Sequence, residues 1–418
     1  MNKKLIVIIA LLASLTILAV ININLHNNDA SKDLDTINTS VTEEIDEANT
    51  IIEDTSHNEI NEEDNTYSNN SEAANESEVS DIDLADESDN MGLNTADETD
   101  ISSIDTTDET EIIPEDTYDT ITISAAGDVT LGRDEKFGWE RTFDHELEVQ
   151  NGDFGYFFRN VKDIFEADDL TIVNLETTLT TATKKADKKY RFKADPSYVE
   201  ILRQGNIEAV SIANNHTLDF LEKGYQDTLM TLDEAEVGYF GYEHKYITEV
   251  RDVKIGVLGY YSMKVTDKLK EEIKQAIDEL KKDGTDLVIV MFHWGIERDY
   301  WPNSVQKKLA YFSIDSGADL VLGSHPHVVQ GIEEYNGKQI VYSLANFCFG
   351  GNKNPNDKDT MIYIQRFNFK NGELISQEYD IIPCSISSVE SRNNYQPTPL
   401  EGEEAERVIN KINKYSDF

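Results

Sequence analysis

Basic residues are scarce in this sequence: 37 Lys and Arg stand against 81 Asp and Glu, so the formal net charge is −44. Most of the excess lies in residues 26–118, which contain 30 acids and a single lysine, Lys32. Residues 119–418 carry 51 acids and 34 Lys and Arg, a balance that is normal for a soluble domain. No basic patch stands out, which argues against duplex nucleic acid as a partner.

Two further absences concern the N-terminus, where Lys3 and Lys4 precede an apolar run from Leu5 to Ile21. Neither a small-x-small cleavage site nor a cysteine for lipid attachment follows that run. Roughly 17–21 helical residues at about 1.5 Å each would cross the bilayer core. We therefore expect residues 1–25 to form a transmembrane signal-anchor at the cell membrane, single-pass, with the lysines inside and the globular part extracytoplasmic. A cleaved signal peptide is the alternative.

Large apolar side chains are missing from residues 26–118, which hold two Tyr and no Phe or Trp. Such a segment cannot bury enough apolar surface to offset the entropy lost on ordering. We predict an acidic disordered linker that holds the globular part away from the membrane. Binding of cations or of a cationic wall component is the alternative.

Only two cysteines are present, Cys348 and Cys384. In an exported protein they could form a disulfide. Two buried free thiols are the other interpretation, and we favour it slightly.

From residue 119 the pattern changes to alternating strands and helices. Continuous apolar runs, typical of buried strands, lie at 121–126, 170–173, 209–213, 287–292 and 320–322. Helical patterns follow at 268–282 and 305–312, and Gly317 ends the second. This alternation predicts an α/β domain over residues 119–390.

The C-terminal part adds antiparallel pairing. Asn-Gly turns at 335–338 and 370–373 predict hairpins, with strands at 339–349 and 361–369. Residues 391–418 are expected to form a helical tail.

Side chains that can bind metal or transfer protons follow five of the predicted strands. In open α/β sheets, sites form beyond the carboxyl ends of strands. A lone histidine or Gly-Asp at such a place is more often structural, and for a lone His-Pro-His the two interpretations are about even. Five strand ends together indicate a site for divalent metal, with Mn, Zn or Fe suited to carboxylates, an amide and imidazoles. If His325-Pro-His327 were extended, its two imidazoles would lie on the same side of the segment. The candidates are Asp128, Glu176, Asn215 with His216, His293, and His325 with His327.

Six short motifs occur in a characteristic order. They are GDVTLGR at 127–133, NLE at 174–176, NNHTLD at 214–219, HWGIE at 293–297, GAD with HPHVVQ at 317–330, and YSLANF at 342–347. This set resembles the capsule-synthesis CapA (PgsA) family of poly-gamma-glutamate biosynthesis proteins, from about residue 120 to 386. That family is similar in turn to calcineurin-like metallophosphoesterases, which implies a four-layer metallophosphatase-like sandwich of two mixed sheets flanked by helices, with two metals.

The resemblance implies roles for single residues. His216 would be the general acid or would orient substrate, and Arg133 would hold an anionic substrate group, although a surface salt bridge is an equal alternative for Arg133. Glu297 and the segment 190–192 would line the same pocket. The implied metal ligands are Asp128, Glu176, Asn215, His293, His325 and His327.

Two positions depart from the phosphoesterase pattern. Thr130 stands where the first motif of those enzymes has a histidine, and Glu176 replaces a bridging aspartate. One of the two metal positions is therefore short of a ligand, so "metallophosphatase-like" describes the expected fold.

The expected function is biosynthesis or export of a poly-gamma-glutamate-type capsule polymer at the outer membrane face, with a metal-dependent hydrolase-like site. The expected partners are the anionic polymer, the membrane and other capsule synthase subunits. One alternative is a non-catalytic module that binds the polymer or the synthase through a degenerate metal site. Another is a cell-surface metallophosphoesterase with an unrelated substrate.

Overall fold

The computed structural model describes residues 116–417 of the chain. The predicted anchor at 1–25 and the predicted linker up to residue 115 lie outside this range. Among the described residues, no helix has both the length and the apolar character needed to cross a membrane.

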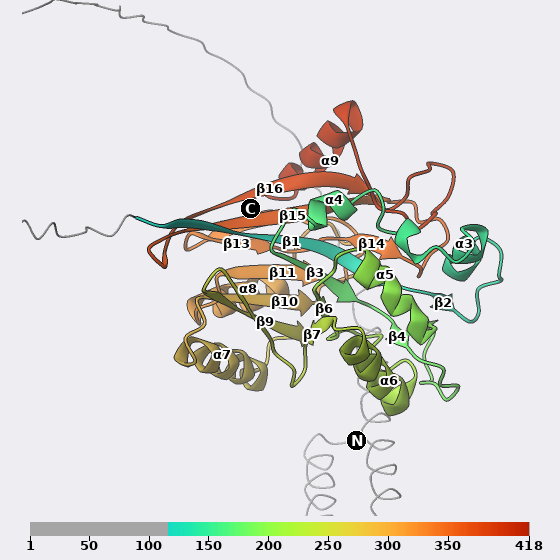
Figure 1. The fold of residues 1–418 in the computed structure, drawn as a ribbon, viewed down its shortest axis with the longest axis horizontal. Helices are drawn as coiled ribbons and strands as arrows, with labels where there is room; N and C mark the ends of the chain where they lie inside the picture. Colours follow the sequence, from blue (N-terminus) through green and yellow to red (C-terminus); the bar gives the residue numbers. More distant parts are fainter. Residues whose placement is uncertain (1–115, 418) are drawn as a thin grey trace, which may run out of the picture. The chain divides into compact units, whose positions relative to one another are not determined.

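The described part is a mixed α/β fold built on two large mixed sheets (Figure 1). In the first sheet, β1, β3, β6 and β7 run parallel, whereas β15, β16 and β17 add antiparallel strands beside β1. Strand β14 pairs parallel with the last residues of β1. The strands, in sheet order, are β17 (Thr398–Pro399), β16 (Glu373–Ser385), β15 (Asp359–Lys370), β1 (Tyr118–Thr130), β3 (Leu170–Leu175), β6 (Ala209–Ser211) and β7 (Gly238–Phe240), with β14 (Asn346–Phe349).

The second sheet has four parallel strands at its centre and an antiparallel strand at each edge. In sheet order its strands are β12 (Ile332–Tyr335), β13 (Lys338–Val341), β11 (Leu320–Ser324), β10 (Leu287–His293), β9 (Val253–Tyr261) and β8 (Tyr246–Val250). A small third sheet joins β2 (Arg133–Asp134), β5 (Phe192–Ala194) and β4 (Thr178–Leu179).

The two large sheets share one hydrophobic core, to which β1 and β3 contribute from one side and β9, β10 and β11 from the other. Helices cover the outer faces. The first sheet packs on α3 (Phe143–Val149), α4 (Lys162–Phe165), α5 (Val199–Gln204) and α6 (Leu221–Glu234), and the second on α7 (Asp267–Lys282) and α8 (Ser304–Asp315). Because β3 and β10 are covered on both faces, every residue in them is buried, which explains their unbroken apolar runs.

Most elements predicted from the sequence are confirmed. Ile273, Ile277 and Leu280 form the buried face of α7. Both Asn-Gly hairpins are present, and Asn336 and Gly337 have the positive φ values, 50° and 72°, that such a turn requires. The cysteines, both within the described residues, are free and buried.

One predicted strand is wrong. Residues 339–349 do not form a single strand, because β13 belongs to the second sheet and β14 to the first. The chain crosses between the sheets at residues 342–345, where Ala345 has a φ of 63°. The segment contains no Gly or Pro, so its composition carries no turn signal at the change of sheet.

The crossing segment, residues 342–345, is bonded to both sheets. The backbone N–H of Asp128 in β1 donates to the Ala345 carbonyl (2.8 Å), and the Leu344 N–H donates to the Gly323 carbonyl in β11 (3.0 Å). A glycine of each sheet makes room for it: a Cβ on Gly127 would lie 1.8 Å from the Ala345 oxygen, and one on Gly323 would lie 2.1 Å from the Tyr342 oxygen. The segment therefore fixes the end of β1 against the end of β11.

The last residues of the chain belong to both cores. Tyr395 is fully buried beneath the first sheet, and α9 (Gly402–Lys414) inserts Val408 and Ile412 into the core between the sheets. Arg407 and Lys411 of α9 form ion pairs with Asp359 of β15. In Figure 1 this helix lies beside β16, with which it packs.

Gly127→Ala should destabilise the protein by about 3 kcal/mol or more, because the added methyl group meets a backbone oxygen that cannot move without breaking its bond to Asp128. Urea denaturation monitored by circular dichroism measures this. Gly138→Ala is the control, because nothing lies within 4 Å of a Cβ at that position. Equal stability of the two variants would contradict the close packing described here.

Candidate metal centre

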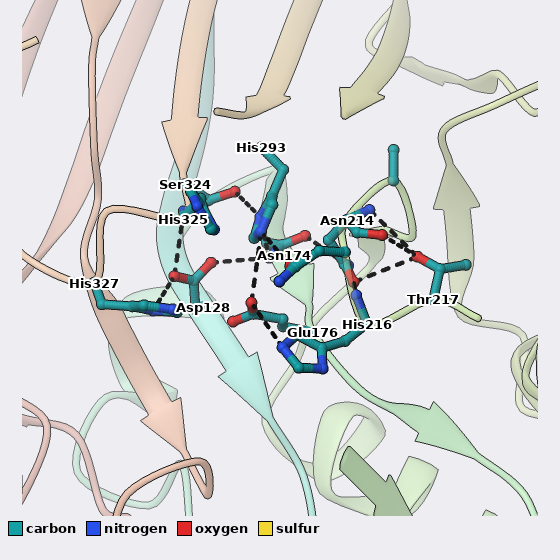
Figure 2. A network of polar contacts seen from close by, with 12 residues as sticks. Asp128, Asn174, Glu176, Asn214, His216, Thr217, His293, Ser324, His325 and His327 are labelled. Atoms are coloured by element: carbon teal, nitrogen blue, oxygen red, sulfur yellow. Dashed lines mark hydrogen bonds and ion pairs between the residues drawn. The ribbon is translucent and has the colours of Figure 1, made fainter. Parts of the chain in front are cut away.

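Buried polar side chains from both large sheets meet where their parallel strands end (Figure 2). The first sheet supplies Asp128 from β1, Asn174 and Glu176 from the end of β3, and residues 214–216 after β6. The second sheet supplies His293 from β10 and residues 324–327 from β11 onward. The structure thus brings together all six metal ligands predicted from the sequence and His216.

Asp128 and His327 form one side of the cluster. Oδ1 of Asp128 accepts a hydrogen bond from Asn174 Nδ2 (2.8 Å), and its Oδ2 lies 3.1 Å from His327 Nδ1. His327 Nδ1 also lies 2.8 Å from Asn346 Oδ1, at the start of β14. Asn174 and Asn346 therefore hold this carboxylate–imidazole pair in place from two strands.

His293 lies on the other side and is contacted at both ring nitrogens. Its Nδ1 lies 3.0 Å from Ser324 Oγ and 3.2 Å from Asn174 Nδ2. Its Nε2 lies 2.8 Å from Asn215 Oδ1 and 3.5 Å from Glu176 Oε1. The ring orientation is thus set by residues of both sheets.

Glu176 lies at the centre and is fully buried. Neither of its carboxylate oxygens has a hydrogen-bond partner within residues 116–417, and Nδ1 of buried His325 also lacks one. A buried carboxylate without a partner costs several kcal/mol unless a cation compensates it. A metal ion bound here would compensate the Glu176 carboxylate and would explain why these atoms have no hydrogen-bond partner in the protein.

Two groups of side chains have the spacing to hold a metal ion, and they share Glu176. One is Glu176 with His293 and His325, and the other is Asp128 with Glu176 and His327. In each group the candidate ligand atoms lie within 4.8 Å of one another. Carboxylate and imidazole ligands are compatible with Mn, Zn or Fe.

The histidines differ in their electrostatics. Burial lowers the pKa of His293 well below its usual value, with neighbouring His325 adding to the effect. Burial, together with the charge of His327, lowers the pKa of His325 to about 4. Both are therefore neutral near pH 7, the form that binds metal.

The two acids and His327 are linked by charge. Burial, followed by the charge of Asp128, raises the pKa of Glu176 well above its usual range. Burial acts to lower the pKa of His327, but the negative charges of Glu176 and Asp128 outweigh it and raise this pKa to about 9. In the absence of a metal ion, His327 is the only positively charged side chain that pairs with Asp128 among the described residues.

His325 and His327 have positive φ angles, 95° and 56°. Few residues with side chains adopt this region, and such conformations persist only where the surroundings impose them. Here the Arg298 N–H donates to the Pro326 carbonyl (2.8 Å) and the His325 N–H contacts Asp128 Oδ2 (3.4 Å). The backbone is bent so that both imidazoles reach the cluster.

His216 lies at the edge of the cluster, with its Nε2 3.9 Å from Glu176 Oε1. Its Nδ1 lies 2.7 Å from Asp219 Oδ2, and its ring packs on Phe192 with 4.2 Å between centroids. Burial lowers the pKa of His216, although Asp219 opposes the shift. Asp219 also accepts from the Phe192 N–H (2.6 Å) and from Lys188 Nζ (2.6 Å), so its position is fixed independently of His216.

Arg133 does not contact this cluster; its partners among the described residues lie elsewhere. Arg133 Nε pairs with Asp144 Oδ2 (2.7 Å), and its guanidinium lies over Trp139. These residues line a separate cavity of about 250 Å³. The sequence also predicted that Glu297 and the segment 190–192 line the pocket. Phe192 of that segment contacts His216. Glu297 is exposed, and its negative charge contributes to the raised pKa of Glu176.

Sequence reasoning did not single out Asn174, Asp219, Ser324 or Asn346 as members of the site. One signal was available for Asn174: it precedes Glu176 by two residues, so both side chains leave the strand on the same side. Asp219 stands inside the NNHTLD motif but was given no role. Nothing local marks Ser324 or Asn346, because their partners come from the opposite sheet.

Comparison with known proteins gives consistent results. The family model described as bacterial capsule synthesis protein PGA_cap matches residues 122–351. The PGA biosynthesis protein CapA of Bacillus subtilis (strain 168) is 30% identical over 325 residues, covering 72% of this chain and 80% of the relative. The capsule biosynthesis protein CapA of Bacillus anthracis is 30% identical over 298 residues, covering 64% of this chain and 68% of the relative.

A solved structure is also similar, at a lower level. The crystal structure of a hypothetical protein from Thermus thermophilus is 16% identical, with a TM-score of 0.40, and covers 63% of this chain and 99% of that one. A likeness at this level says nothing about activity.

Glu176→Gln should raise the stability of protein stripped of metal with EDTA, because it removes a buried carboxylate that has no hydrogen-bond partner among the described residues, and it should weaken metal retention. We expect a gain of about 1–3 kcal/mol in urea denaturation of the stripped protein. Glu403→Gln, on the exposed face of α9, should change neither property. A loss of stability in stripped Glu176→Gln would show that the carboxylate has a partner in the protein itself.

Proposed function

Because the chain belongs to the bacterial capsule synthesis family PGA_cap, we propose that it serves in the biosynthesis or export of a poly-gamma-glutamate-type capsule polymer and carries a metal-dependent hydrolase-like site. The names of its relatives concern capsule and PGA biosynthesis, which supports the polymer role. The observation that carries the metal site is the buried carboxylate of Glu176, which has no hydrogen-bond partner among the described residues and is shared by two candidate ligand groups.

The proposed arrangement is that of a metallophosphoesterase-type sandwich of four layers. Two mixed sheets with a common core and helices on both outer faces support it. The position of the ligands at the carboxyl ends of strands in both sheets supports it as well. Departure from the phosphoesterase pattern is confined to Thr130 and Glu176 among the ligand positions.

Metal ions bound here would supply Lewis-acid polarisation of a phosphoryl or carbonyl oxygen. Glu176, His293 and His325 would hold one ion, with Asn215 Oδ1 beside His293 as a further ligand. Asp128, Glu176 and His327 would hold a second.

His216 would transfer a proton through Nε2. With Nδ1 hydrogen-bonded to Asp219, the Nε2 atom points toward Glu176 and the centre. A carboxylate that fixes the ring and its tautomer in this way is a common support for a catalytic histidine. Asp219 would therefore act as a positioning residue, itself held by Lys188 and the Phe192 N–H.

We propose that this chemistry takes place at the outer face of the cell membrane, with residues 1–25 as the anchor. The support is the apolar run behind Lys3 and Lys4. Capsule polymers lie outside the cell, which fits that placement.

A second candidate function is a non-catalytic module that binds the polymer or the synthase. Thr130 favours it: this residue replaces a metal-ligating histidine, and its buried hydroxyl has no hydrogen-bond partner among residues 116–417. A site with metal but without hydrolysis would identify this function.

We expect the purified full-length chain to retain between one and two equivalents of Mn, Zn or Fe, measured by inductively coupled plasma mass spectrometry. His293→Ala and His327→Ala should each lower the content, because each removes a ligand from a different group. His244→Ala, outside the centre, serves as the control. Less than half an equivalent in the wild type would refute the metal site.

His216→Ala should lower the rate of phosphodiester hydrolysis by about 100-fold or more at unchanged metal content, because general acid–base groups contribute on that order. Asp219→Asn should have a smaller effect and should shift the pH–rate profile. The measurement is the release of p-nitrophenol from bis(p-nitrophenyl) phosphate. Equal rates of wild type and His216→Ala would remove His216 from the mechanism.

A further inference from the structure

A dense run of basic residues lies beside the candidate metal centre, and apart from Lys188 it has no part in the chemistry proposed above. Of residues 184–193, six are Lys or Arg and only Asp187 is acidic, in a chain with 37 Lys and Arg among 418 residues. The expectation that no basic patch stands out is therefore wrong at this scale, because the acidity of the whole chain conceals it. This basic segment contains Lys184, Lys185, Lys188, Lys189, Arg191 and Lys193.

The basic segment connects β4 to β5 and is fastened to the centre. Lys188 Nζ donates to the backbone carbonyl of Asn215 (2.6 Å) and to Asp219 Oδ1 (2.6 Å). Phe192, at the start of β5, packs on the ring of His216. An anion bound along this segment would therefore lie next to the proposed proton-transfer residue.

Half of the positive charges already bind carboxylates. Lys185 and Lys193 pair with the partly exposed Glu135, and Lys188 pairs with Asp219. Because Lys185 and Lys193 bind the same carboxylate, the segment folds back on itself and gathers its positive charges in one area that holds carboxylates.

The remaining charges are directed to solvent or to the backbone. Lys184 and Lys189 are exposed, and neither has a carboxylate partner among the described residues. Arg191 donates to the carbonyls of Ala186 (2.9 Å) and Lys188 (2.8 Å), and its charge has no carboxylate counterion within residues 116–417. The segment keeps an excess of positive charge that an external anion can neutralise.

We propose that the basic segment holds an acidic polymer with one carboxylate per repeat unit and guides it past the metal centre. Arg191 bonds back to the carbonyls of Ala186 and Lys188, so the segment is folded, and its exposed charges can contact neighbouring repeat units of a flexible polymer at once. Many weak carboxylate contacts hold a polymer while allowing it to slide, as an export or processing step requires. The identity of the polymer rests on the proposed function; the existence of a polyanion surface does not.

The test uses the full-length chain and fluorescently labelled poly-gamma-glutamate of defined length, with binding measured by anisotropy at low and high salt. Lys184→Gln combined with Lys189→Gln should weaken binding about fivefold and flatten its salt dependence, because exposed charge pairs are weak singly and screened by salt. The matched control is Lys268→Gln combined with Lys308→Gln, exposed lysines on α7 and α8, which should bind as the wild type does.

Equal affinity of the two double variants would overturn the proposal. So would binding of phosphatidylglycerol vesicles without binding of the polymer, which would make the segment a membrane contact. Failure of wild type and variants alike to bind the polymer would overturn it too.

Metal content separates this inference from the proposed function. A chain without metal whose polymer binding still depends on Lys184 and Lys189 would refute the metal-dependent site and support the basic segment. A chain that binds metal and hydrolyses its substrate, but whose polymer binding does not depend on Lys184 and Lys189, would support the metal-dependent site and refute the role of the basic segment.

Discussion

The site depends on the crossing segment, residues 342–345, which hydrogen-bonds the end of β1 to the end of β11. The candidate ligands come from two different sheets, so their distances are fixed only if the sheets cannot slide past each other. The bonded backbone atoms belong to Asp128 itself and to Gly323, two residues before His325. Two glycines allow this close approach, and a methyl group on either would meet a backbone oxygen.

The candidate metal centre contains electrostatic interactions that are unfavourable in the absence of a metal ion. Asp128 and Glu176 lie buried together, the raised pKa of His327 keeps it in the charged form, and burial keeps two other histidines neutral. Positive φ angles at His325 and His327 add conformational strain. Such an arrangement weakens the fold locally and is retained where a bound cation or a reaction makes use of it.

The sequence predicted the centre better than it predicted the path of the chain. Each ligand follows an apolar strand, and the carboxyl ends of parallel strands meet at one edge, so the ligands could be found from the order of strands. The change of sheet at residues 342–345 could not, because no Gly or Pro marks it and the signal lies in long-range hydrogen bonds. Asn346 and Ser324 were missed for the same reason. The basic segment was missed because the net charge was counted over all of residues 119–418, and this hides the local excess of Lys and Arg in residues 184–193.

Pairing between distant strands also constrains the order in which the fold can be assembled. Strand β1 pairs along its first eight residues with β15, some 250 positions later in the chain, and α9 completes the core between the sheets. Closing loops of that length is entropically costly and slow. Strand β1, the first strand of the described residues, therefore keeps one edge unpaired until β15 is available to it, and during that interval the unpaired edge exposes the chain to aggregation.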